Sequence, residues 1–150
     1  MKQDKINKEM NKFLSYLYMG ENTFRIYLRN VQEDDLMDLL TTHINKFKEH
    51  EQNIEEKISN YCAVKKNLSF MQKRVLCMER MKADGRSDMK LAFLAVKAIN
   101  MGLESAMKFL YEYYSYLPKD FADNALIIVA YYGEVNSDLK AYILKKIKKD

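Results

Sequence analysis

The only two histidines, His43 and His50, fall in one segment of the chain, on either side of Phe47. Imidazole is a common metal ligand, and a Glu-x-x-His pattern places a carboxylate and an imidazole on one helix face. Here Leu40 stands three residues before His43, and Phe47 stands three residues before His50. In a helix the two imidazoles lie about 10 Å apart, too far for both to bind one ion. We therefore expect both histidines to be hydrogen-bonded residues on a packed face.

The alternative interpretation of His50 is an atypical site that binds a single metal ion. The second ligand would be a carboxylate from another helix, such as Glu21 or Glu104. Because histidine titrates near neutral pH, a pH-sensitive interface is a further alternative.

Other catalytic patterns are absent from the sequence. Cys62 and Cys77 form no C-x-x-C pair, and both are expected to be reduced thiols, distant in sequence from the histidines. No glycine-rich phosphate loop follows a strand. We therefore expect a protein that is not an enzyme, with no catalytic, cofactor-binding or metal-binding residues.

Apolar residues recur at steps of three and four over four long segments, which predicts four long helices. Glycine and proline are scarce, with four glycines and one proline, too few for a fold rich in tight turns. The predicted inner faces are, in order, Phe13, Leu17, Gly20, Phe24, Tyr27 and Val31; Leu36, Leu40, His43, Phe47, His50, Ile54 and Ile58; and, near the C-terminus, Ala125, Ile128, Tyr132, Val135, Leu139 and Tyr142.

The helices are predicted to form two hairpins, about 5–60 and 88–146, within one domain that spans residues 1–150. A shorter helix, about 69–82, lies between them, because Ser69 and Gln72 have the spacing of a capping box. The sequence Met-Gly recurs 82 residues apart, at Gly20 and Gly102. The sequence thus predicts an all-α, ferritin-like antiparallel four-helix bundle with a short extra helix in its long crossover.

The bulk composition indicates a globular protein, with 48% hydrophobic and 31% charged residues. The N-terminus lacks the apolar core of a signal peptide, and the longest apolar run, Ala125 to Tyr132, is too short to cross a bilayer. We therefore expect a cytoplasmic protein.

The net charge of +4 includes a basic C-terminus, formed by Lys140, Lys145, Lys146, Lys148 and Lys149. We interpret it as a solvated last turn that complements the helix dipole. An adaptor that binds nucleic acid or an anionic membrane is the weaker alternative, and neither partner is expected.

Several short motifs together resemble a known group. They are the two Met-Gly pairs, the segment from Asn45 to His50, and the methionine-containing crossover from Ser69 to Met81. This pattern, over about residues 11–144, resembles small uncharacterised bacterial ferritin-like proteins of clostridial type, distant relatives of rubrerythrin. The resemblance implies a carboxylate-bridged pair of metal ions in the bundle core.

The ligands for such a pair are missing from the expected positions. Leu17 and Ile99 precede the Met-Gly pairs where carboxylates are expected, and Phe47 replaces the glutamate before His50. Near the C-terminus, Glu134 is followed three residues later by Ser137 instead of histidine. We therefore expect the di-metal site to be lost.

Eleven tyrosines are an unusual number, and four of them cluster at Tyr111, Tyr113, Tyr114 and Tyr116. Consecutive aromatic residues cannot all face one core, so this corner is either local packing or a sticky patch. Our main expectation is a structural or interaction protein without metal. It self-associates through the 88–116 helix and the tyrosine corner, with the spore coat or exosporium as one location.

Overall fold

The computed structural model describes residues 1–149, and almost all of them are helical. The helices are α1 (Gln3–Leu28), α2 (Asp34–Ser59), α3 (Phe70–Ala83), α4 (Asp88–Tyr113) and α5 (Lys119–Lys149), with a 3-10 turn η1 (Tyr114–Tyr116). The predicted all-α class is confirmed, with boundaries within a few residues of those expected. No helix within residues 1–149 is long and apolar enough to cross a membrane.

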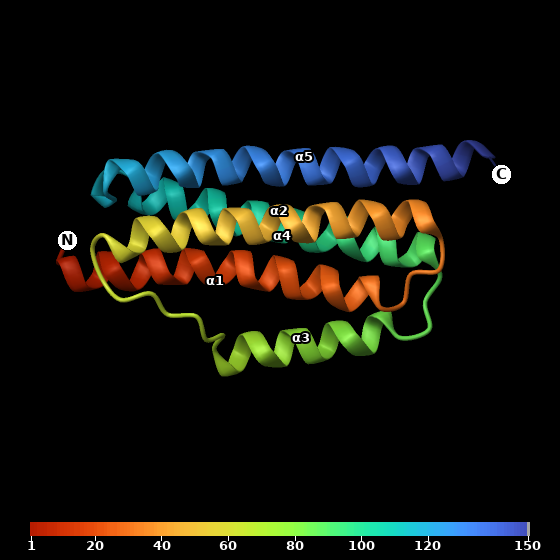
Figure 1. Ribbon diagram of the computed structural model, residues 1–150, viewed down its shortest axis with the longest axis horizontal. Coiled ribbons are helices and arrows are strands. Elements are labelled where there is room, and N and C mark those ends of the chain that lie inside the picture. The colour runs from red at the N-terminus through yellow and green to blue at the C-terminus, as the bar shows by residue number, and fades with distance from the viewer. Residues whose placement is uncertain (150) are drawn as a thin grey trace.

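Four long helices form the bundle, and α3 lies outside it along α1 (Figure 1). The chain returns along the whole bundle between α2 and α4, so that α4 starts at the same end as α2. Each long helix packs against two others: α1 against α2 and α4, and α5 against α2 and α4. This is the ferritin-like arrangement, in which a long crossover joins two helical hairpins.

The crossover is fixed to α1 by side chains at both ends. Asn11 donates to the carbonyl oxygen of Ala63 at 3.1 Å and accepts from the amide of Lys65 at 2.8 Å. Further along, Tyr27 donates to the Glu79 carboxylate at 2.9 Å. The predicted capping box of Ser69 and Gln72 is present at the start of α3.

Hydrogen bonds and ion pairs join the helices at one end of the bundle. The Asp88 carboxylate at the start of α4 accepts from the amides of Gln32 and Glu33, at 2.9 and 2.7 Å. From α5, the Lys146 ammonium pairs with Glu33 at 2.7 Å and Asp35 at 2.9 Å. This member of the basic C-terminus therefore joins α5 to the start of α2, where negative charge also suits the helix dipole.

Aromatic rings fill the middle of the bundle. The fully buried Phe47 ring packs against Gly20, where a β-carbon would come within 2.7 Å of the ring. Tyr132 lies against Gly102 in the same way, but a β-carbon there would be 3.8 Å from its ring. The rings of Phe47 and Tyr132 are themselves 6.1 Å apart, centre to centre. The two Met-Gly pairs therefore make room for two rings.

These distances predict opposite effects for two Gly→Ala substitutions. Gly20→Ala overpacks the immobile Phe47 ring and lowers the free energy of unfolding by about 1–3 kcal/mol. Gly102→Ala gains helix propensity without a clash and raises the free energy of unfolding by about 1 kcal/mol. Urea denaturation measures both, and Gly133→Ala serves as a control because no atom lies within 4 Å of its added carbon. Equal effects at Gly20 and Gly102 would contradict this packing.

Candidate functional site

A group of oxygen-bearing side chains lies between α1 and α2. It consists of Tyr18 and Glu21 on α1 and Glu51 and Glu55 on α2, and is called here the carboxylate cluster. Tyr18 donates a short hydrogen bond to Glu55, and Glu51 shares a hydrogen bond with Glu21. Glu51 is only 7% exposed, and its Oε2 atom has no partner among the described residues.

The carboxylates of this cluster are only partly neutralised by positively charged side chains. Burial first, and then the neighbouring Glu21 and Glu55, raise the pKa of Glu51 to about 9. Burial of the Tyr18 side chain and the neighbouring Glu55 carboxylate raise the pKa of Tyr18. Arg25 pairs with Glu21 at 2.6 Å, and Lys66 reaches Glu55 only at 3.9 Å. Glu51 itself has no cationic partner, so a proton or a cation stabilises it.

Glu51 was not among the residues expected at a site. Its signal in the sequence is its position on the inner stripe of α2, four residues after Phe47 and three before Ile54. A carboxylate among apolar positions is the exception that marks a site.

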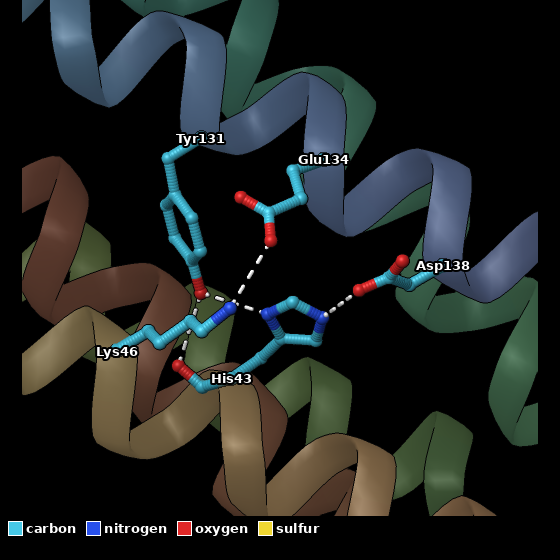
Figure 2. Close-up of polar contacts among 5 residues, drawn as sticks. All are labelled: His43, Lys46, Tyr131, Glu134 and Asp138. Carbon is cyan, nitrogen blue, oxygen red and sulfur yellow. Dashed lines mark hydrogen bonds and ion pairs between the residues drawn. The ribbon is translucent and has the colours of Figure 1, made fainter.

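On its other side, α2 carries both histidines toward α5, and Figure 2 shows His43 with its partners there. His43 is fully buried, with Nδ1 at 3.0 Å from the Tyr131 hydroxyl and Nε2 at 2.9 Å from the Asp138 carboxylate. The same hydroxyl lies 3.1 Å from the backbone carbonyl oxygen of His43, so its single hydrogen is shared between that oxygen and Nδ1. In the neutral ring, Nε2–H donates to Asp138 and Nδ1 accepts from Tyr131. This confirms a packed, hydrogen-bonded role for His43.

His50 differs, because its Nδ1 is buried without a hydrogen-bond partner among the described residues. Its ring stacks on Tyr131 at 4.5 Å, centre to centre, and borders a surface hollow with Glu49 and Glu134. The Lys46 ammonium pairs with Glu134 at 3.1 Å at the same hollow (Figure 2). The expected hydrogen bond of His50 is therefore absent, and a lysine already supplies positive charge there.

The two carboxylates expected to assist His50 lie elsewhere. Glu104 is on the surface of α4, where it pairs with Lys108 at 3.0 Å. Glu21 belongs to the carboxylate cluster, where it meets Glu51 on the α1 side of α2. Within residues 1–149, no group of three or more His, Cys, Asp or Glu side chains is arranged so that it could hold a metal ion.

The residues of the bundle centre do not fit a pair of metal ions. Leu17 and Ile99 are buried aliphatic side chains at the positions where carboxylates were expected. Phe47 and Tyr132 supply rings between them instead of carboxylate oxygens. Of these four side chains, only Tyr132 carries an atom that can bind a metal ion, its phenol oxygen.

The tyrosine corner is divided between core and surface. Tyr113 is 7% exposed and packs on Phe109, whereas Tyr111 is 95% exposed. Tyr114 and Tyr116 are about half exposed, at 48% and 52%. Tyr113 therefore belongs to local packing, whereas Tyr111, Tyr114 and Tyr116 lie at the surface.

Comparisons with known proteins concern the fold alone. No family model matches the chain, and no curated protein matches it either. A solved structure that matches is the bacterioferritin-related protein from Bacteroides fragilis, described as a dodecameric thioferritin. The TM-score is 0.76 at 16% sequence identity, over 99% of this chain and 90% of that one. The ferritin-like bundle inferred from the Met-Gly motifs is thereby confirmed.

The same comparison corrects the functional prediction. We expected a structural or interaction protein without metal, with the spore coat as one location. The likeness to a thioferritin contradicts that main interpretation and favours the alternative of a metal-binding or redox protein of ferritin-like type. That expectation rested on Leu17 and Ile99 in place of carboxylates and on the lack of a histidine three residues after Glu134.

The burial of His43 predicts a pH dependence of stability. Burial lowers its pKa below the ordinary 6.5, and the neighbouring Asp138 only partly opposes this shift. Below pH 6.5 the unfolded chain therefore binds more protons than the folded one, so stability falls as the pH falls from 6.5 toward 5. Urea titrations of wild type and His43→Gln measure this, and the variant is expected to lose part of the slope. An identical slope in both proteins would contradict the assignment.

Proposed function

We propose that this chain is a metal-binding or redox protein of the ferritin-like class, whose ion is held by the carboxylate cluster. The observation that carries the proposal is Glu51, whose carboxylate is buried beside Glu21 with an oxygen that has no partner. A buried carboxylate is costly unless a proton, a donor or a cation compensates it. No enzymatic turnover forms part of this proposal, and a relationship to rubrerythrin is proposed on the Met-Gly motifs alone.

The donor set favours an ion that prefers oxygen ligands. Glu21, Glu51 and Glu55 supply carboxylates, and Tyr18 adds a hydroxyl group. Such ligands suit manganese and other hard ions, and carboxylates also hold iron in ferritin-like bundles. Manganese and iron are therefore the expected ions.

Binding requires movements of these side chains, because within residues 1–149 no three of them converge on one point. Glu55 has to turn from Tyr18 and give up their short hydrogen bond. The ion pair of Glu55 with Lys66, which is 71% exposed and 3.9 Å away, contributes only about 0–1 kcal/mol. Glu21, whose side chain is 14% exposed, has to share its charge between Arg25 and the ion.

The hollow beside His50 is the less favourable location. Lys46 already neutralises Glu134 there, and a metal ion would have to displace it. Glu49, the other carboxylate at this hollow, lies on the exposed side of α2. Glu51 has no such competitor.

Titration with manganese(II), and with iron(II) under anaerobic conditions, tests this proposal. Wild type is expected to bind about one ion per chain, and Glu51→Gln to bind at least about tenfold more weakly, because an amide supplies no negative charge. His50→Ala and Glu104→Gln are matched controls that should bind like wild type. Thermal unfolding verifies that all variants fold. Loss of binding in His50→Ala with retention in Glu51→Gln would place the ion in the other hollow and overturn the proposal.

We also propose that the chain assembles with copies of itself through the outer side of α3. Phe70, Met71 and Met81 are 73%, 68% and 74% exposed, more than Phe93 at 50% or Met101 at 62% on α4, where only Tyr111 among residues 1–149 is more exposed. Exposed apolar side chains concentrated on one short helix indicate an interaction surface. The structurally similar thioferritin is described as a dodecamer, which supports assembly as a property of this kind of bundle.

Light scattering on two variants tests the assembly. Phe70→Ser with Met71→Ser is expected to lower the native mass, because burial of such side chains contributes about 1.5–3 kcal/mol each. Phe93→Ser is the control on α4, the surface expected from the sequence. A lower mass only for Phe93→Ser would show that α4, and not α3, carries the contact.

A further inference from the structure

A pocket of about 250 Å³ lies between the bundle and its crossover helix. Gln72, Val75 and Glu79 of α3 form one wall, and the opposite walls include Gly20 of α1 and Gly102 of α4. The absence of a side chain at Gly102 leaves part of this space open, since a β-carbon there would face the pocket residue Tyr132. Its position under α3 and on the α4 side of α1 separates it from the carboxylate cluster, which lies between α1 and α2.

The walls of the pocket are predominantly apolar. They include the rings of Tyr16 and Phe24, the aliphatic Ile99 and the flexible thioethers of Met19 and Met101. Methionine adapts to ligands of different shape and makes favourable contacts with aromatic rings. A dry apolar cavity of about 150 Å³ takes up benzene, so this pocket has room for a two-ring compound.

A tyrosine hydroxyl stands at the inner wall. Tyr132 is 2% exposed, and burial raises its pKa, so the hydroxyl is neutral. The hydroxyl lies 4.0 Å from the place of a β-carbon on Gly102, and Tyr132 lines the pocket. Tyr132 is not among the buried side chains whose polar atoms lack a partner within residues 1–149, so its hydroxyl is open to the pocket, where a polar atom on a ligand would replace water as its partner.

The charge at the pocket is negative. Glu79 lines it and accepts hydrogen bonds from Tyr27 at 2.9 Å and Lys82 at 3.4 Å. Within residues 1–149, no lysine, arginine or histidine contributes to the pocket wall. Carboxylate and phosphate ligands are therefore disfavoured, because no positive charge offsets theirs.

We propose that this pocket binds an uncharged, largely apolar ring compound of about two rings, which carries one hydroxyl or carbonyl group for Tyr132. The rings lie among the methionine and aromatic side chains, and the polar group meets the Tyr132 hydroxyl. This ligand site does not depend on the metal proposed above. It uses the gap between α3 and the bundle, which Gly102 leaves open.

The test uses 2-naphthol, naphthalene and 2-naphthoate as probes in calorimetric titrations of the metal-free full chain. We expect 2-naphthol to bind at about one equivalent and 2-naphthoate to bind at least about tenfold more weakly. Gly102→Leu fills the pocket and is expected to weaken both uncharged probes at least about tenfold. Gly133→Leu is the matched control, because the same side chain added there points into open space and should leave binding unchanged.

The role of the hydroxyl is tested by Tyr132→Phe, which removes only the hydroxyl group and should fold like wild type. It is expected to weaken 2-naphthol about 3- to 10-fold, the value of one neutral hydrogen bond, and to leave naphthalene unaffected. Equal 2-naphthol binding by wild type, Gly102→Leu and Tyr132→Phe would overturn the proposal. Preference for 2-naphthoate would overturn the assigned ligand class.

Discussion

The contact between Phe47 and Gly20 is the constraint on which the rest of the structure depends. The ring lies so close to the α1 backbone that even one extra carbon would overlap it. It also packs edge to face on Phe24 at 5.5 Å and on Tyr131 at 5.4 Å. One side chain of α2 thus contacts both α1 and α5, and it cannot move without disturbing the whole centre.

A centre filled with rings moves the polar groups to either side of α2. Glu51 faces α1, and the two histidines face α5, where Tyr131 separates His50 from His43. Tyr132 lies between the carboxylate cluster and the pocket under α3. The Glu51 carboxylate contributes to its raised pKa, and its side chain lines the pocket. The buried side chains Leu17, Phe47 and Ile99 leave the bundle centre without carboxylates, and the nearest acidic cluster lies beside it, which is the basis of the functional proposal.

Helical periodicity was sufficient to predict the bundle, because each inner residue occurs at steps of three and four. Ser69 and Gln72 likewise marked the start of α3 through a local hydrogen-bond pattern. The candidate site was not predictable in the same way. Glu51 meets Glu21 across 30 residues of sequence, and only the angle between α1 and α2 brings them together. Nor does periodicity show that Lys46 is beside His50 or that α3 leaves a gap above Gly102.

X-ray absorption spectroscopy of the protein loaded with manganese or iron tests the central claim most directly. The carboxylate cluster predicts a first shell of oxygen atoms alone, at about 2.0–2.2 Å, with no second metal nearby. Scattering from imidazole would place the ion at a histidine. A metal–metal distance of about 3.5–4 Å would show a paired site, and either result would contradict the account.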